Sequence, residues 1–173
     1  MEKICTRLYD APCGRLLLGS IGDRLCLCRW LSELHPGRVD GRLARLLGAE
    51  FCDGATAVTD EAARQLDAYF LGRRTEFSVG LVFAGTSFQQ RVWRQLLAVP
   101  YGQTVSYAAL ARLMGSPQSV RAVAGANGAN AMSVFVPCHR VVGADGSLTG
   151  YAGGLEAKRY LLLLERRVAA RGF

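Results

Sequence analysis

Residues 106–129 read SYAALARLMG-SPQSVRAVAGANGA, and this stretch decides the fold class of the second half of the chain. Ser106 is a helix-capping residue type in front of apolar residues at helical spacing, and the segment stops at Gly115. Ser116 and Pro117 have the order of an N-cap followed by a proline at the first helical position, which predicts a second helix. Two short helices separated by a Gly-Ser turn are typical of a helix-turn-helix.

The second of these predicted helices carries unusually small side chains. From Ala122 to Ala129 no residue is larger than valine or asparagine, so the helix backbone can approach a neighbour closely. Two interpretations are open. The segment either packs tightly in a core or lies against a nucleic-acid groove, with the long basic side chain of Arg121 at its start.

Other elements follow from the same kind of signal. The second half is expected to contain a helix opened by a Ser87/Gln90 capping box, a hairpin wing turned at Asp145-Gly146 between residues 141–142 and 148–149, and a final helix over 155–167. The first half is expected to contain strands over 3–8, 15–20, 24–30 and 77–83 and helices over 40–47 and 60–71. We therefore predict an α+β chain of two domains, a sheet-plus-helix domain over 1–83 and a helical, winged helix-turn-helix domain over 84–173.

The charge divides at the same boundary. Residues 1–83 contain 11 Lys and Arg against 11 Asp and Glu, whereas residues 84–173 contain 10 Lys and Arg against 3 Asp and Glu. The whole net charge of +7 thus belongs to the second half. This asymmetry favours a polyanion as the partner of the basic half, and ordinary surface charge that maintains solubility is the alternative.

Several classes of protein are excluded by composition. The longest apolar runs, 107–111 and 160–164, are five residues each, far below the roughly 20 that a membrane-spanning helix needs. Charged residues near the start argue against a secretory signal. We expect a cytoplasmic protein, or a nuclear one in a eukaryote, without membrane contact, and six cysteines that stay reduced.

Five of the six cysteines precede residue 53, which leaves Cys138 isolated within V134-F-V-P-C-H-R-V-V142. Cysteine is a nucleophile as its thiolate, and a neighbouring His139 or Arg140 is expected to lower its pKa. Adjacent residues of a strand point in opposite directions, so His139 could act on Cys138 only if Pro137 bends the chain or a water bridges the two. A buried structural cysteine is the alternative.

These residues resemble the active-site motif of the O(6)-alkylguanine-DNA alkyltransferases, the methylated-DNA–protein-cysteine methyltransferase family. The similarity covers residues 86–165 and rests on blocks in the family's order: Ser87–Trp93, Pro100–Tyr107, Arg121–Val123, Asn130, Pro137–Val141 and Gly150–Leu155. It implies an RNase H-like fold for the N-terminal domain. It also implies a monomer that uses no cofactor and repairs double-stranded DNA containing O(6)-alkylguanine, and O(4)-alkylthymine as well. We expect no metal, because the zinc ligands of some N-terminal domains in the family match only at Cys5; a zinc site at Cys26, Cys28 and His35 is the weaker alternative.

The resemblance also implies roles for individual residues. Cys138 would attack the alkyl carbon and keep the alkyl group irreversibly, once per molecule. His139 would take the thiol proton through a water, Glu165 would orient that histidine, and Asn130 would brace the active-site turn. A further set would bind the base flipped from the minor groove or the DNA: Tyr107, Arg121, Ala122, Arg140, Val141, Tyr151 and Ala152. Within it, Tyr107 contacts the base, Arg121 fills the gap left in the stack, and Val141, Tyr151 and Ala152 form the base pocket.

Two other classes remain as alternatives. Alkyltransferase-like lesion sensors bind damaged DNA without repairing it and have tryptophan or alanine at the position of Cys138. A winged-helix regulator would need no Pro-Cys-His-Arg motif and would usually dimerise on palindromic sites. The chain departs from the family's pattern at Ala131, where proline is frequent, which would loosen the turn. It departs again at Gly128, where some members carry a second arginine, which would lower DNA affinity.

Overall fold

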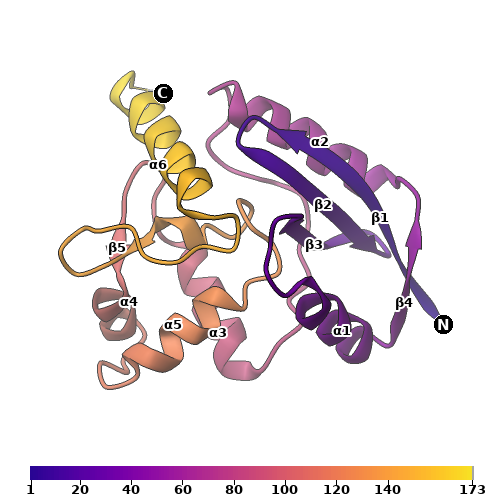
Figure 1. Cartoon of the computed structure of the whole chain (residues 1–173), viewed down its shortest axis with the longest axis horizontal. Helices are drawn as coiled ribbons and strands as arrows, with labels where there is room; N and C mark the ends of the chain where they lie inside the picture. The colour runs from indigo at the N-terminus through magenta and orange to yellow at the C-terminus, as the bar shows by residue number, and fades with distance from the viewer. Residues whose placement is uncertain (173) are drawn as a thin grey trace.

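A meander of three antiparallel strands opens the chain, as the alternating segments predict. These are β1 (Glu2–Ala11), β2 (Gly14–Ile21) and β3 (Arg24–Trp30), in a computed structural model that describes residues 1–172 (Figure 1). A fourth strand, β4 (Ala49–Asp53), pairs in parallel with β1 and gives the order β3-β2-β1-β4. β4 was not predicted, because five residues of mixed polarity carry little periodic signal.

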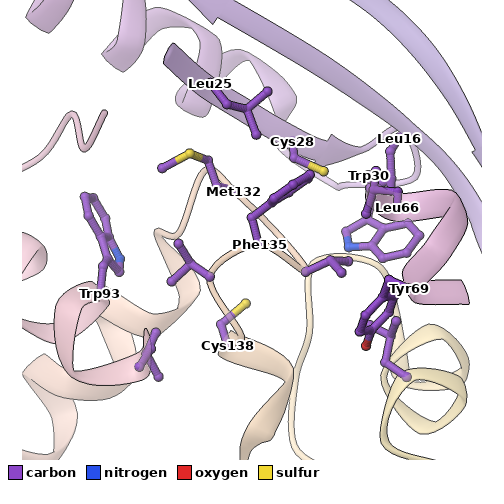
Figure 2. Close-up of a cluster of buried hydrophobic side chains, with 14 of the residues drawn as sticks. Leu16, Leu25, Cys28, Trp30, Leu66, Tyr69, Trp93, Met132, Phe135 and Cys138 are labelled. Carbon is purple, nitrogen blue, oxygen red and sulfur yellow. The ribbon is translucent and has the colours of Figure 1, made fainter. Parts of the chain in front are cut away.

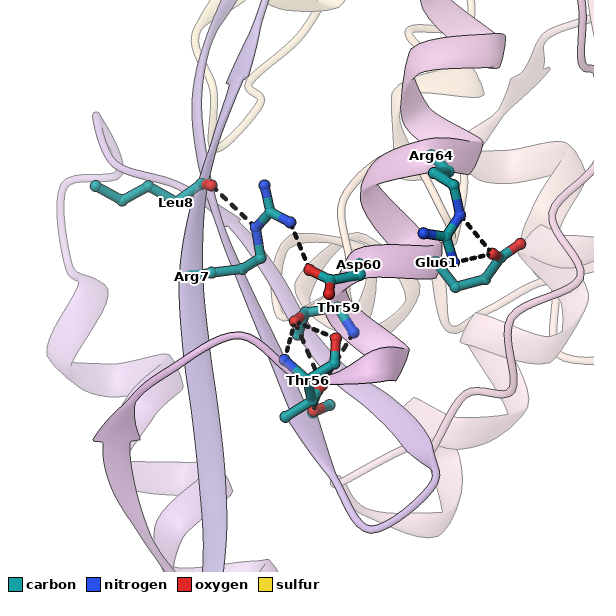
Figure 3. A network of polar contacts seen from close by, with 8 residues as sticks. Arg7, Leu8, Thr56, Thr59, Asp60, Glu61 and Arg64 are labelled. Atoms are coloured by element: carbon teal, nitrogen blue, oxygen red, sulfur yellow. Dashed lines mark hydrogen bonds and ion pairs between the residues drawn. The ribbon is translucent and has the colours of Figure 1, made fainter.

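Two helices cover this sheet. α1 (Pro36–Leu47) buries Val39 and Leu43 in one apolar cluster, and α2 (Ala57–Phe70) buries Leu66 in another. Both are longer than the predicted segments 40–47 and 60–71. The N-terminus of α2 is fixed by a capping box between Thr56 and Thr59 and by an ion pair of 2.7 Å between Arg7 of β1 and Asp60 (Figure 3). The position of α2 relative to β1 is thereby set at its first turn.

Residues 77–83 do not form the predicted strand. They make a single bridge to β3, where the Leu25 N–H donates to the Gly80 carbonyl at 2.8 Å and the Val82 N–H donates to the Leu25 carbonyl at 3.0 Å. The apolar residues that suggested a strand pack individually against the core instead; Phe77, for example, stacks on Phe135 with ring centroids 4.5 Å apart.

The second half is mainly helical, with α3 (Ser87–Leu97), α4 (Tyr107–Leu113), α5 (Val120–Gly128) and α6 (Leu155–Ala170). Ser106 caps α4 as predicted, but two other predicted caps are wrong. The capping box of α3 is formed by Thr86 and Gln89, one position earlier than Ser87 and Gln90. α5 starts only at Val120, and Ser116 and Pro117 belong to the turn before it.

The predicted hairpin wing is also wrong. Residues Val141–Val142 form β6, which pairs in parallel with β5 (Val105–Ser106) rather than with residues 148–149. A tight turn remains, closed by the Gly143 N–H donating to the Ser147 carbonyl at 2.9 Å. Thr149 is engaged elsewhere, because its carbonyl accepts a hydrogen bond from Lys158 and its hydroxyl lies 2.9 Å from that of Tyr107.

A single apolar cluster joins the two halves (Figure 2). Trp30 and Tyr69 contribute to it from the first half and Trp93, Phe135 and Cys138 from the second, all nearly or fully buried. Residues 1–83 and 84–173 therefore differ in net charge and in their secondary structure, but they share one hydrophobic core. Among residues 1–172, no helix is long and apolar enough to cross a membrane.

Candidate active site

Cys138 lies in a one-turn 3-10 helix, η1 (Cys138–Arg140), and not in a strand. The strand expectation failed because Pro137, with φ −81° and ψ 61°, turns the chain immediately before the cysteine. The thiol is buried, with 6% of the residue exposed. The bend that would allow His139 to act on the same reaction as Cys138 is thus present.

The turn in front of Cys138 is braced from inside by Asn130. Its amide nitrogen donates to the Val136 carbonyl at 3.0 Å, and its oxygen accepts from the Met132 N–H at 3.0 Å. Val134, between these contacts, has φ +73°, an unusual conformation for a β-branched residue. Such strain costs on the order of 1–3 kcal/mol and is retained only where the surroundings enforce it.

The edge strand of the first half supplies the second brace. The Cys28 N–H of β3 donates to the Ala131 carbonyl at 2.8 Å, and the Ser133 N–H donates to the Cys28 carbonyl at 2.8 Å. Alanine in place of proline at position 131 was expected to loosen the turn. Because the sheet edge and Asn130 both hold this segment, the turn is fixed by contacts other than a proline ring.

Burial dominates the acidity of the thiol. It raises the pKa of Cys138 to about 11, although Asn130 and Lys158 act in the opposite direction. The expectation that an adjacent histidine or arginine lowers this pKa is therefore wrong, since both side chains are directed to Glu165. The thiol form of Cys138 is therefore the favoured one near pH 7. The thiol consequently needs a base nearby.

His139 is suited to be that base. It is fully buried, and its Nε2 lies 2.8 Å from Oε1 of Glu165. Glu165 accepts the Nε2 proton, so the lone pair of a neutral ring is on Nδ1, a buried atom without a hydrogen-bond partner among the described residues. Burial lowers the pKa of His139, and Glu165 only partly offsets this, so the ring is neutral near pH 7.

Glu165 is the centre of a buried polar network. Arg140 donates from Nε to Oε2 and from Nη2 to Oε1, both at 2.9 Å, and the Tyr69 hydroxyl donates to Oε1 at 2.8 Å. Burial opposes the charge of Glu165, but His139 and Arg140 outweigh it and hold the pKa of the carboxyl well below its usual range. Glu165 is therefore ionised throughout the physiological range.

Two members of this network differ from what the sequence indicates. Arg140, expected on the DNA side, is buried, and its Nη1 donates to the Val99 carbonyl at 2.7 Å. Tyr69 was not predicted to belong to the site at all. It comes from α2 in the first half, 96 residues away from Glu165 in the chain. No local sequence motif predicts its contact with the carboxylate.

Lys158 is a second residue that sequence reasoning missed. It is fully buried on α6, and its Nζ donates to the Val141 carbonyl at 2.6 Å and to the Thr149 carbonyl at 3.1 Å. It thereby connects the segment that follows Cys138 to the loop that precedes Tyr151. The Val141 carbonyl, which the resemblance places in the base pocket, accepts one hydrogen bond from this lysine and keeps a second lone pair.

A cavity of about 450 Å³ lies between the two halves, within the roughly 300–1,000 Å³ usual for ligand sites. Its lining combines the β3–α1 loop and α1, one face of α5, and the segment before α6: Glu33, Leu34, His35, Arg38, Val39, Arg42, Gly125, Gly128, Ala129, Gly150, Tyr151 and Ala152. Burial, followed by the charge of Cys138, raises the pKa of Tyr151 in the wall of this cavity.

The helix-turn-helix presents the remaining candidates. Arg121, the second residue of α5, is exposed, as is Ala122 beside it, whereas Val123 is buried. Tyr107 opens α4 and is half-buried. The exposed face of α5 includes Gly125 and Gly128, and a Cβ added at either would meet nothing within 4 Å. The small residues therefore leave the surface of this helix flat beside a single long cation.

Within residues 1–172 no group of three or more His, Cys, Asp and Glu side chains is arranged to hold a metal ion.

Comparisons with known proteins agree with this geometry. Residues 87–167 match the family model described as 6-O-methylguanine DNA methyltransferase, DNA binding domain. Two relatives named methylated-DNA–protein-cysteine methyltransferase come from Mycolicibacterium paratuberculosis (55% identical over 161 residues, 93% of this chain and 92% of that protein) and Mycobacterium leprae (46% over 161 residues, 92% and 91%). The crystal structure of Mycobacterium tuberculosis OGT in complex with DNA superimposes with a TM-score of 0.79 at 43% identity, covering 96% of this chain and 94% of that one.

Proposed function

Because the chain belongs to the methylated-DNA–protein-cysteine methyltransferase family, we propose that Cys138 is the acceptor with which it removes the alkyl group from O(6)-alkylguanine in DNA. The observation that carries this assignment is that Cys138 and His139 lie in the same buried 3-10 turn, and that His139 is in contact with Glu165. The reaction is a direct reversal of damage, and it ends with the alkyl group on the protein. Each molecule acts once, and the reaction needs no cofactor.

In the proposed reaction the proton of the Cys138 thiol moves to His139, and the electron pair left on sulfur attacks the alkyl carbon. Nδ1 of His139 takes the thiol proton of Cys138 through a water, and the resulting imidazolium is stabilised by Glu165. The thiolate attacks the alkyl carbon, a carbon–sulfur bond forms and the carbon–oxygen bond to guanine breaks. Tyr107 supplies a proton to the departing base. Burial favours the step, because a desolvated thiolate loses its charge when it is alkylated.

A base within a duplex cannot reach a buried thiol, so the nucleotide must be flipped out. We assign the cavity between the two halves to the flipped base, since Tyr151 and Ala152, which the family resemblance places in the base pocket, line it together with α5. Arg121 fills the gap in the base stack while the flat face of α5 follows the minor groove. The excess positive charge of the second half, +7, meets the phosphates there.

Tyr69 is a positioning residue in this scheme. Its hydroxyl is one of three donors to Oε1 of Glu165, together with His139 and Arg140, and it acts on the reaction only through that carboxylate. Residues of the first half thus complete the site.

The DNA substrate also favours the cytoplasmic location that the sequence predicts.

The test is the intact mass of the protein after incubation with a duplex containing O(6)-methylguanine. We expect a gain of one methyl group, located on Cys138 by peptide mapping. Cys138→Ser should bind the duplex with unchanged affinity and gain nothing, because a serine hydroxyl stays protonated where a thiolate can form. An unchanged mass of the native protein that still binds the lesion would instead support a lesion sensor.

A further inference from the structure

Two cysteines outside the active site lie side by side on neighbouring strands. Cys5 of β1 and Cys52 of β4 are direct partners in the parallel register, and their sulfur atoms are 3.0 Å apart. Both are free thiols, and both are partly exposed. Nothing in the transfer reaction uses them.

The backbone already satisfies the requirements of a disulfide at this position. Neighbouring strands lie about 4.8 Å apart. The Cα atoms of disulfide-bonded cysteines are usually about 4.4–6.8 Å apart, so this spacing suits a disulfide. Paired residues of adjacent strands project from the same face of the sheet. Rotation of the side chains is therefore sufficient to join the sulfur atoms, without movement of either strand.

We propose that Cys5 and Cys52 are a reversible redox-modification site, which closes to a disulfide when hydrogen peroxide or another small peroxide oxidises it. One thiol transfers an electron pair to the peroxide, whose O–O bond breaks; a sulfenic acid forms and water is released. The second thiol attacks that sulfur, the S–S bond forms and a second water leaves with the remaining proton. Dithiol reductants reopen the bond by exchange.

The other cysteines are less suited to this chemistry. Cys26, Cys28 and Cys138 are buried, and burial raises the pKa of Cys26 to about 12 and that of Cys138 to about 11. Cys13 is partly buried, its pKa is raised to about 11 by burial, and it has no sulfur partner among the described residues. Cys5 and Cys52 differ from these four by geometry, because both are partly exposed and their sulfur atoms are in contact; that contact raises the pKa of Cys52 as well.

The position of the pair gives the bond a structural consequence. Ser20, the cross-strand partner of Cys5, lies 2.7 Å from the Thr56 hydroxyl that caps α2. A covalent link between β1 and β4 therefore fixes the sheet edge from which α2 departs. We expect the oxidised protein to unfold several degrees higher than the reduced one, because the bond closes residues 5–52 into a loop in the unfolded chain.

Trypsin offers a direct test on the full chain, since it separates the pair into peptides 4–7 and 46–64 and leaves Cys13, Cys26/Cys28 and Cys138 on three others. The reduced protein is treated with hydrogen peroxide, its free thiols are blocked with iodoacetamide, and it is digested without reductant. We expect a linked peptide of 4–7 with 46–64, an intact mass lower by about two hydrogens before blocking, and reversal by dithiothreitol.

Matched variants separate this site from general oxidation. Cys5→Ser and Cys52→Ser should lose the linked peptide and the rise in Tm, whereas Cys13→Ser should keep both. Methyl transfer by the oxidised native protein should stay stoichiometric, because Cys138 is not consumed. Complete alkylation of both thiols after peroxide, or a link that joins other cysteines in preference to this pair, would overturn the proposal without touching the assignment of Cys138.

Discussion

Tyr69→Phe should slow alkyl transfer although the residue lies in the half of the chain that carries no net charge. The change removes one hydroxyl from a fully buried ring and leaves the ring packing intact. The lost bond is the one donated at 2.8 Å to ionised Glu165. Hydrogen bonds to charged groups contribute about 1.5–3 kcal/mol. A loss of this size in the transition state slows the reaction about tenfold to a hundredfold, at about 1.4 kcal/mol per factor of ten.

The assay compares single-turnover transfer from a duplex containing O(6)-methylguanine with transfer from free O(6)-benzylguanine. Both rates should fall by the same factor, since Tyr69 acts through Glu165 and not through DNA. The pH dependence gives a second readout. Burial lowers the pKa of His139 and Glu165 raises it. With one donor fewer, the Glu165 charge is less neutralised, the pKa of His139 rises, and the acid limb of the rate profile moves to higher pH.

Tyr101→Phe is the matched control. Tyr101 packs edge-on against Tyr69 with ring centroids 6.2 Å apart. Its hydroxyl is also buried but has no hydrogen-bond partner among residues 1–172. Its removal should change neither rate nor the acid limb. Equal effects of the two variants, or a Tyr69→Phe protein with reduced stability but an unshifted pH profile, would refute a positioning role.

Three further outcomes are expected. Arg121→Ala should slow transfer from duplex DNA tenfold or more and leave transfer from free O(6)-benzylguanine unchanged, because only the duplex requires the gap in the stack to be filled; equal losses would mean that Arg121 supports the site itself. Lys158→Met should lower the free energy of unfolding in urea by about 2–4 kcal/mol, since the buried Val141 carbonyl and the partly buried Thr149 carbonyl lose their donor, and a change below about 0.5 kcal/mol would contradict that role. Deletion of residues 1–83 should abolish transfer and cooperative unfolding, because Trp30 and Tyr69 leave the shared core; a truncated protein that still reacts at the native rate would show that the second half is sufficient.

Local signals in the sequence were enough for the order of elements but not for their ends. The three-stranded meander, α4 with its Ser106 cap and the final helix are confirmed, because alternation and capping are local properties. The two misplaced helix starts were displaced by one and by three residues. Thr86 caps α3 although Ser87 beside it is an equally good capping residue type, and α5 begins after Ser119, which makes no side-chain cap. The absent strand at 77–83 and the absent hairpin failed for another reason, because pairing depends on which strand edge is available in three dimensions.

For the active site, too, the residues could be proposed from local sequence, whereas their environment could not. Cys138 and His139 are adjacent in sequence and were proposed from one motif, and Glu165 and Asn130 were proposed from the family resemblance; the structure brings His139 and Glu165 into contact. The environment could not be predicted. The raised pKa of the thiol follows from burial, the inward course of Arg140 follows from the position of Glu165, and the contribution of Tyr69 depends on how α2 meets α6. Each is a property of the packed chain.

The contacts that complete the site also have a consequence for the timing of synthesis. Tyr69 and Glu165 are separated by 96 residues, and Trp30 and Tyr151, whose indole N–H and hydroxyl lie 3.2 Å apart, by 121. Contacts at such separations form late in folding, whereas the N-terminal meander pairs locally. On the ribosome the sheet can assemble first, but the acceptor stays without its carboxylate until most of α6 has emerged. Since each molecule is used once, repair capacity in a growing cell is replenished only as fast as complete chains are made.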